Sequence, residues 1–129
     1  MIVADTNLIA ALVCRTEHTE TAIQVWEKDS DWVAPEIWQS ELRNVMVMLL
    51  RSKFIIMDTA LETYRLAHHF VETVPAGTGT ILRLCEEYPL TAYDAEFAAL
   101  SQHLGIPTVS FDPDLTGAGL AVTPKQFLQ

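Results

Sequence analysis

The chain has 129 residues, half of them apolar, with 17 acidic and 8 basic side chains and a formal net charge of −9 at pH 7. This length fits one globular domain, residues 1–129, whose core needs neither disulfides nor a structural metal. The surplus of carboxylates excludes a protein that coats nucleic acid with Lys and Arg, so an anionic substrate would need another source of positive charge.

The sequence shows no targeting signal and no cysteine framework. No uninterrupted apolar run, such as the one at 45–50, approaches the roughly 18 residues of a membrane-spanning helix, and the N-terminus lacks the charged segment of a secretory signal. Cys14 and Cys85 have no spacing typical of a zinc site or a disulfide, so we expect both to be free. These features predict a cytoplasmic protein that does not associate with a membrane.

Apolar periodicity, proline, glycine and capping residues predict the elements in chain order. The first strand, at 1–4, is a continuous apolar run of the kind found in strands buried on both faces. Pro35 suits the first turn of a helix. The first half of the chain is predicted to contain a strand at 1–4, helices at 7–14 and 17–29, a strand at 32–34 and a helix at 35–51.

The second half continues the alternation of helices and strands. Asp58 is the predicted N-cap of a helix to about residue 71, and Thr91 and Gly105 are predicted to cap the two ends of a helix at 92–104. The other predicted elements are a turn at 77–79, a helix at 80–88, a strand at 106–111, a turn at 112–114, a short strand at 120–122 and a helical turn from 124. Strands separated by helices predict an α/β fold, with a central, mostly parallel β-sheet flanked by α-helices.

Four carboxylates stand where a solvated acid is not expected: Asp5, Glu41, Asp94 and Asp112. Asp5 and Asp112 follow apolar strands, and ligands bind at the carboxyl ends of parallel strands. Glu41 and Asp94 each lie four residues from apolar side chains on a helix face. Burying such charges without partners costs several kcal/mol each, so we expect them to converge on something cationic.

Carboxylates without neighbouring Cys or His favour a hard divalent ion, Mg²⁺ or Mn²⁺, over zinc. Two such ions about 4 Å apart would activate a water, stabilise the pentacovalent phosphate and screen the leaving oxygen during phosphodiester hydrolysis. The ions would also supply the positive charge that the composition lacks.

Each carboxylate also has a purely structural interpretation. Asp5 could be an N-cap, and Thr91 with Asp94 matches a capping box. Glu41 lies near a helix start, where the helix dipole favours acids, and 112–114 has the composition of an ordinary turn. The joint placement of all four acids favours the functional interpretation.

Short motifs along nearly the whole chain resemble those of the PIN domain family, and more narrowly the VapC-type toxins of bacterial and archaeal toxin–antitoxin pairs. The motifs are VADTN at 3–7, PE at 35–36, ELRNV at 41–45, TAYDA at 91–95, AAL at 98–100, LGIP at 104–107 and SFD at 110–112. The resemblance implies a PIN-like fold and a metal-dependent ribonuclease that cuts RNA to 5′-phosphate and 3′-hydroxyl ends. It also implies a homodimer and a cognate antitoxin that occludes the acidic site.

Carried over residue by residue, the resemblance makes Asp5, Glu41, Asp94 and Asp112 the acidic quartet. Asp5, Asp94 and Asp112 would lie closest to the main ion, and Glu41 would hold a second ion or orient the attacking water. The supporting polar positions are Thr6, Asn7 and Ser110, with Asp114 as the alternative to Asp112.

Two further interpretations concern cations and aromatic residues. Basic side chains at 43, 51 and 53 lie on or just after the Glu41 helix, where they could contact RNA phosphates or simply form a solvated helix face. A binding module is the alternative to an enzyme: a catalytically silent PIN-like domain that docks a protein partner through Trp26, Trp32 and Trp38.

Overall fold

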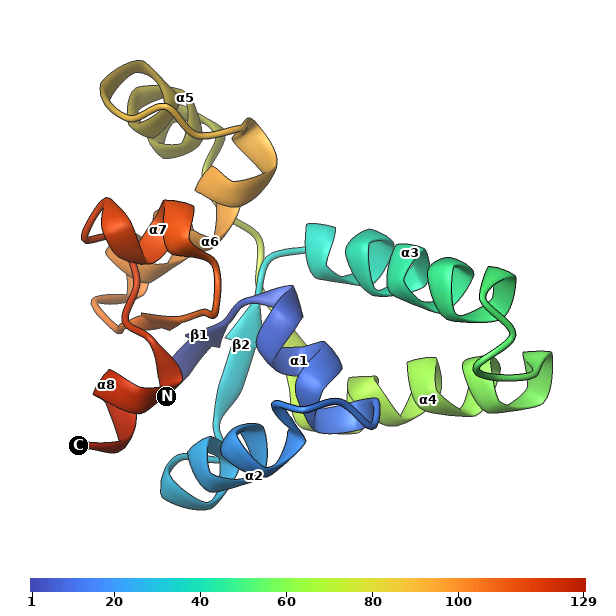
Figure 1. The fold of residues 1–129 in the computed structure, drawn as a ribbon. Coiled ribbons are helices and arrows are strands. Elements are labelled where there is room, and N and C mark those ends of the chain that lie inside the picture. Colours follow the sequence, from blue (N-terminus) through green and yellow to red (C-terminus); the bar gives the residue numbers. More distant parts are fainter.

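The computed structural model describes residues 1–129 as a four-stranded sheet surrounded by eight helices (Figure 1). The strands are β1 (Ile2–Ala4), β2 (Trp32–Ala34), β3 (Val71–Thr73) and β4 (Thr108–Val109). The helices are α1 (Thr6–Val13), α2 (Thr19–Lys28), α3 (Ile37–Arg51), α4 (Met57–Phe70), α5 (Thr78–Glu87), α6 (Ala92–Leu104), α7 (Pro113–Gly117) and α8 (Pro124–Leu128).

The sheet is entirely parallel, with the strand order β3-β2-β1-β4. Val3 of β1 lies opposite Val33 on one side and opposite Thr108 on the other, so β1 is a central strand. Both of its faces are buried, as its continuous apolar run predicts. The predicted α/β fold, a parallel sheet flanked by helices, is confirmed. Because parallel strands end at one edge, the segments that follow β1, β2 and β4 meet there.

Two groups of helices flank the sheet (Figure 1). On one side α3 and α4 pack against each other as an antiparallel hairpin, and both contact α1. On the other side α5 packs on α6, which in turn contacts β1 and β4. Helix α2 lies beside α8, and there the Lys28 ammonium group donates to the backbone carbonyl of Phe127. The first residues after β1 and β4 thus lie between the two groups.

The core contains the largest apolar side chains of the chain. Trp32 and Trp38 have essentially no exposed surface, and Trp26 packs edge-on against Trp32. The predicted docking surface of three tryptophans is therefore wrong, because two of them are core residues. Cys14 and Cys85 are both free, as predicted. None of the helices combines the length and the apolarity that crossing a bilayer requires.

Several predicted boundaries need correction. β3 begins directly after α4, where only a helix end was predicted, because its three residues pair with β2 across a long sequence separation. The predicted strand at 106–111 is reduced to β4, and the one at 120–122 to a single bridge from Val122 to Val109. Residues 113–117 form α7 instead of a turn, since Asp112 caps it and Pro113 occupies its first position.

Helix caps were predicted with mixed success. The Thr91 hydroxyl oxygen accepts from the backbone N–H of Asp94, and Gly105 ends α6 at φ +67°, both as predicted. A left-handed φ suits glycine because it has no Cβ to clash with the backbone. Asp58, in contrast, lies inside the first turn of α4, whose N-cap is Ile56 without a side-chain hydrogen bond. The connection after α3 is shorter than predicted, because α4 begins at Met57, two residues before the position that an N-cap at Asp58 would give.

Candidate metal and nuclease site

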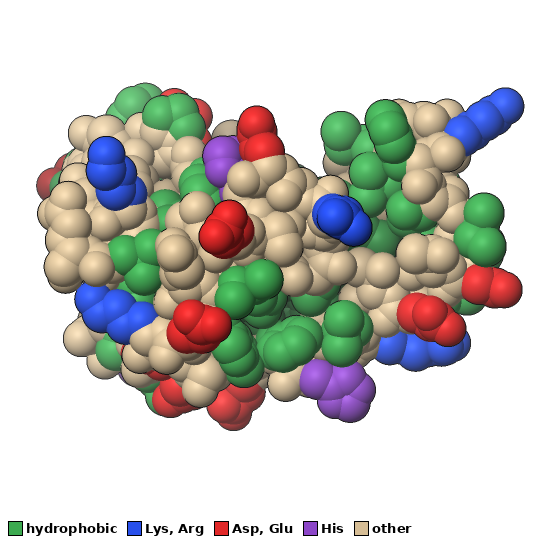
Figure 2. All heavy atoms as spheres, turned by 60° about the horizontal axis from the view of Figure 1, so that its bottom comes forward, with side chains coloured by type: hydrophobic (Ala, Val, Ile, Leu, Met, Phe, Trp, Pro, Cys, Tyr) green, Lys and Arg blue, Asp and Glu red, His purple; other side chains and the backbone are tan.

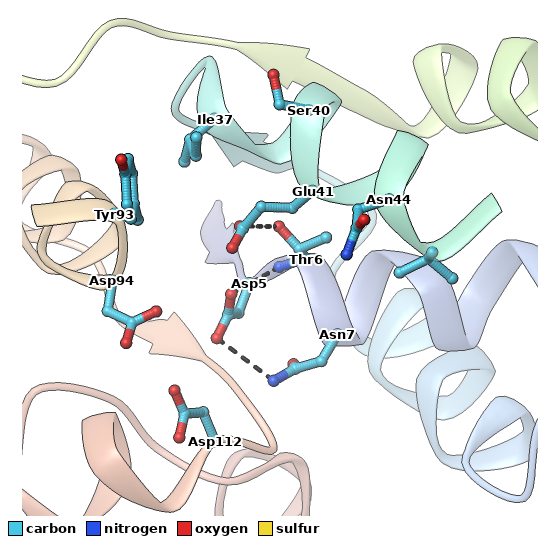
Figure 3. A pocket seen from close by; sticks show the side chains of 11 residues that line it. Asp5, Thr6, Asn7, Ile37, Ser40, Glu41, Asn44, Tyr93, Asp94 and Asp112 are labelled. Carbon is cyan, nitrogen blue, oxygen red and sulfur yellow. Dashed lines mark hydrogen bonds between the residues drawn. The ribbon is translucent and has the colours of Figure 1, made fainter. Parts of the chain in front are cut away.

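An open pocket of about 470 Å³ lies at the carboxyl edge of the sheet, between the two helix groups (Figure 3). It gathers residues from β1–α1, from α3, from the start of α6 and from the segment after β4. All four acids of the predicted quartet line it. The lining residues are Asp5, Thr6, Asn7, Ile37, Ser40, Glu41, Asn44, Val45, Tyr93, Asp94 and Asp112.

Asp5 is placed at the floor of this pocket by the end of β1. It is 7% exposed and serves as the N-cap of α1, because one carboxylate oxygen accepts from the backbone N–H of Thr6 at 2.7 Å. Its other oxygen accepts from the Ser110 hydroxyl group and, at 3.4 Å, from the Asn7 amide. The structural interpretation of Asp5 as a cap is thus correct, and the same side chain also lines the pocket.

Ser110 and Asn7 hold the ends of β1 and β4 together. Ser110 directly follows β4 and is fully buried. Its hydroxyl group donates to Asp5. The hydroxyl oxygen also accepts from the Asn7 amide at 3.3 Å and from the backbone N–H of Asp112 at 2.9 Å. The Asn7 side-chain oxygen accepts from the backbone N–H of Phe111 at 3.2 Å. These bonds fix the backbone that carries Asp112 relative to Asp5, although Ser110, rather than Asp112, is the residue that directly follows the strand.

Glu41 reaches the pocket from the second turn of α3. Its carboxylate accepts from the Thr6 hydroxyl group at 2.7 Å, a contact across 35 positions of sequence. Ile37 and Val45 line the pocket beside it, which agrees with the predicted shared helix face. Thr6 therefore orients Glu41 from the first turn of α1.

Asp94, Asp112 and Asp114 offer carboxylate oxygens that all lie within 4.8 Å of one another. Asp94 is in the first turn of α6; Thr91 caps the backbone N–H of Asp94, so only one half of the predicted capping box forms. Asp112 lines the pocket and caps α7, whereas Asp114 is exposed. The resemblance implied that Asp5, Asp94 and Asp112 lie closest to the main ion. The group of three in the structure contains Asp114 instead of Asp5.

Burial and mutual repulsion both oppose ionisation of these acids. Burial, partly offset by hydrogen bonds from Ser110 and Thr6, raises the pKa of Asp5 to about 6. Burial also raises the pKa of Glu41, and the nearby carboxylates of Asp94 and Asp112 raise it further. The pKa of Asp94 is raised by burial and by the charge of Asp112. Such a cluster is unfavourable as four bare anions, and a cation would relieve the repulsion.

Positive charge near the pocket comes from backbone rather than side chains. None of the eight Lys and Arg side chains lines it. Instead the N-termini of α1, α3, α6 and α7 border it, because Asp5 and Asp112 are N-caps, Ile37 begins α3 and Asp94 is in the first turn of α6. Each helix N-terminus stabilises a nearby anion by about 0.3–1 kcal/mol, which lowers but does not remove the cost of gathering the acids.

The donor set fits a hard divalent ion. Oxygen ligands alone are present: carboxylates from Asp94, Asp112 and Asp114, a further carboxylate from Asp5, and that of Glu41 across the pocket. No Cys or His lines the pocket. This chemistry is that of Mg²⁺ or Mn²⁺ sites, and it doesn't fit a structural zinc ion.

The structure adds pocket residues that the sequence analysis did not assign. Glu41 and four further lining residues lie on one face of α3, at positions 37, 40, 41, 44 and 45, which is the i, i+3, i+4, i+7, i+8 spacing of a helix. That spacing would have revealed Ser40 and Asn44 once Glu41 was chosen. Tyr93, next to Asp94, also lines the pocket. Glu96 has a pKa raised by its own burial and by the charges of Glu41 and Glu36.

Comparison with known families agrees with the fold. The family model of the PIN domain matches residues 2–119. Because this match spans most of the chain, the protein belongs to the PIN domain family. No curated protein sequence matched the chain.

Several solved structures share this fold at low sequence identity. A chain of a toxin–antitoxin complex from Klebsiella pneumoniae is 22% identical, with a TM-score of 0.73 and coverage of 96% of this chain and 98% of that one. VapC20 of Mycobacterium tuberculosis, a sarcin-ricin loop cleaving toxin, is 20% identical, with a TM-score of 0.68 and coverage of 92% and 95%. PAE2754 from Pyrobaculum aerophilum is 19% identical, with a TM-score of 0.79 and coverage of 98% and 85%.

Proposed function

We propose that this PIN-domain protein is a metal-dependent endoribonuclease and the toxin of a toxin–antitoxin pair. One observation carries the proposal: Asp5, Glu41, Asp94 and Asp112, from four separate segments, converge on one pocket that no Lys or Arg lines. A fold stabilised only by packing has no reason to gather carboxylates whose pKa values burial and repulsion raise.

The acids would hold Mg²⁺ or Mn²⁺. Asp94 and Asp112 would be ligands, and Asp5 would complete the site from the floor of the pocket. Asp114 could take a position at the exposed edge. Bound there, the ion would activate a water for attack on an RNA phosphodiester and neutralise charge on the phosphate. Glu41 would help to hold a second ion or orient the water.

The remaining polar residues act by orientation. The Ser110 hydroxyl group and the Asn7 amide fix one oxygen of Asp5, and the N–H of Thr6 fixes the other. The Thr6 hydroxyl group holds Glu41. These bonds restrict the rotation of two carboxylates before any ion binds, which lowers the entropy lost on binding.

The structural neighbours support the choice of substrate and partner. One neighbour is part of a toxin–antitoxin complex and another cleaves the sarcin-ricin loop, an RNA element. We infer RNA as the substrate, an antitoxin protein as the partner that blocks the pocket, a homodimer as the assembly, and the cytoplasm, which contains the RNA, as the place of action.

The test is cleavage of a pool of structured RNAs by the purified protein with Mg²⁺, with Mn²⁺ and with EDTA. We expect cutting with either ion and none with EDTA, and we expect Asp94→Asn to lower the rate more than about 100-fold, since even partners of metal ligands contribute about 10–100-fold. Binding of Mn²⁺, measured by calorimetry, should weaken in the same variant.

Asp58→Asn is the matched control. Asp58 is also an aspartate in the first turn of a helix, but it is exposed on α4, away from the pocket. It should cut RNA and bind Mn²⁺ as the wild type does. Full activity in Asp94→Asn would contradict the site, and cutting that persists with EDTA would contradict metal dependence.

A further inference from the structure

Tyr93 is an exposed aromatic side chain on the rim of the acidic pocket (Figure 3). It is the second residue of α6, directly before Asp94, and it is 62% exposed. Ten large hydrophobic side chains are substantially exposed in this protein, and Tyr93 is the only one of them that lines the pocket. Its location therefore sets it apart from the other exposed apolar residues.

The packing of the protein does not explain this ring. Helix α6 buries five other side chains, from Ala95 to Leu100, and neither hydrophobic core cluster includes Tyr93. The backbone of α6 is held at its start by the cap from Thr91, not by the Tyr93 side chain. Replacing the ring should leave the fold intact, so effects on substrate can be separated from effects on stability.

Ile37 and Tyr93, which form an apolar rim of the pocket, lie close in sequence to its carboxylates. Ile37, the first residue of α3, lines the same pocket, and Glu41 lies one turn further along that helix. On α6, Tyr93 directly precedes Asp94, and both line the pocket. Each of the two helices thus contributes an apolar side chain and a carboxylate to the pocket, and a nucleotide whose phosphate lies at the acids would have its base near the rim.

Because acids and no basic side chains line the pocket, RNA needs contacts there that do not depend on charge. No Lys or Arg lines it, so side-chain cations there cannot hold the phosphates that flank the cut. An aromatic face binds a base without depending on charge, and stacking of one base on an aromatic side chain changes affinity substantially in single-strand binding proteins. A base is free to stack on a side chain only where the RNA is unpaired.

We propose that Tyr93 is a substrate-binding residue that stacks on an unpaired base next to the phosphate that is cut, with Ile37 on the other side of that base. This role rests on the ribonuclease function proposed above. It predicts that the protein cuts within single-stranded segments and that the aromatic ring, rather than the hydroxyl group, of Tyr93 contributes to substrate affinity.

The test uses a ten-nucleotide RNA that spans a site cut in the pool experiment, with 2-aminopurine in place of one base beside the cut. The emission of this base falls when it stacks. Binding is measured with Asp5→Asn as the parent protein, so that the RNA stays uncut, and kcat and KM are measured with Asp5 intact. The variants are Tyr93→Phe, Tyr93→Leu and Tyr93→Ala, and the control is Leu82→Ala, an apolar residue on α5 that is as exposed as Tyr93 but lies outside the pocket.

We expect Tyr93→Ala and Tyr93→Leu to weaken RNA binding about 5- to 150-fold, to raise KM more than they lower kcat, and to restore the 2-aminopurine emission. Tyr93→Phe and Leu82→Ala should behave as their parent. On an RNA that lacks the base at the stacked position, the Tyr93 variants and the parent should bind equally.

Three results would overturn this role. They are wild-type affinity and emission in Tyr93→Ala, an equal loss on the RNA without the base, and a loss in Tyr93→Phe as large as in Tyr93→Ala. A wild-type protein that cuts no RNA would instead refute the ribonuclease function itself, and the role of Tyr93 with it. Cutting by the wild type together with unaffected Tyr93 variants refutes the stacking role alone.

Discussion

Asp5 is the only charged side chain that is buried, and it is surrounded by hydrogen-bond donors as well as by other acids. Burial raises its pKa from 3.8 to about 6. Between these two values the folded protein without metal holds a proton that the unfolded chain has released. The stability contributed by this group is therefore greatest at low pH and decreases as the pH rises to about 6, where it levels off.

The buried Asp5 should make the stability of the metal-free protein depend on pH. In EDTA, the free energy of unfolding should fall between pH 4 and pH 7, with about 2 kcal/mol of the fall due to Asp5. Asp5→Asn should remove that part and be more stable than the wild type at pH 7. Urea unfolding at a series of pH values measures both effects.

The control for this prediction is again Asp58→Asn, whose side chain is exposed on α4. It should show the same pH profile as the wild type. If Asp5→Asn lost stability at pH 7 and kept the full pH dependence, the hydrogen bonds to Asp5 would outweigh the cost of its burial. Saturating Mn²⁺ should reduce the difference in stability between the wild type and Asp5→Asn, because the ion stabilises only the folded state that binds it.

At the scale of elements, the pocket depends on where helices begin. The first turn of α6 carries both Tyr93 and Asp94, and the Thr91 hydroxyl oxygen holds this turn through the backbone N–H of Asp94 at 3.1 Å. Helix α8 begins in a similar way with Thr123, which forms a capping box with Gln126. The two threonines therefore have the same local role at different distances from the pocket.

This pair gives the prediction at the element scale. Thr91→Ala and Thr123→Ala should each lower the free energy of unfolding by about 1 kcal/mol, because each loses an N-cap. Only Thr91→Ala should also weaken Mn²⁺ binding, since of these two helices only α6 carries a proposed ligand in its first turn. Urea unfolding and calorimetry measure the two properties. Equal Mn²⁺ affinities in the two variants would show that the cap does not position Asp94.

At the scale of the whole molecule, charge is unevenly distributed. Residues 37–70, which form the α3–α4 hairpin, contain four of the eight basic side chains and only three of the 17 acidic ones. Figure 2 shows the projecting part of the molecule, which carries hydrophobic side chains together with Lys or Arg and some Asp or Glu side chains. Exposed residues there include Arg51, Lys53 and Phe54. The remainder of the chain carries most of the negative charge.

This asymmetry predicts where RNA phosphates bind outside the pocket. Arg51→Gln and Lys53→Gln should each weaken RNA binding and reduce the slope of log affinity against log salt by about 0.7, the value for one phosphate contact on a single strand. Lys125→Gln on α8 is the control, because this helix lies far from the hairpin (Figure 1). A slope that is unchanged in both hairpin variants would mean that their side chains form only a solvated surface.

Much of the fold followed from local sequence signals. The strand–helix alternation, the caps at Thr91 and Gly105 and the parallel sheet were predicted, because each depends on periodicity or on a few neighbouring residues. β3 and α7 were not predicted. β3 exists through its pairing with β2, and the signals for α7, a capping acid and a proline, are the same signals that mark a turn.

The candidate site divides in the same way. The candidate oxygen-only donor set, with Asp5, Glu41 and Asp94, could be predicted from local sequence, since residue type and strand or helix position are local properties. The three-dimensional contacts were needed to show that Ser110 links Asp5 to Asp112, that two tryptophans are buried and that the Tyr93 ring stays exposed. The physical reason is that burial and hydrogen bonding here join residues as far as 105 positions apart, and no local pattern of the chain encodes such contacts.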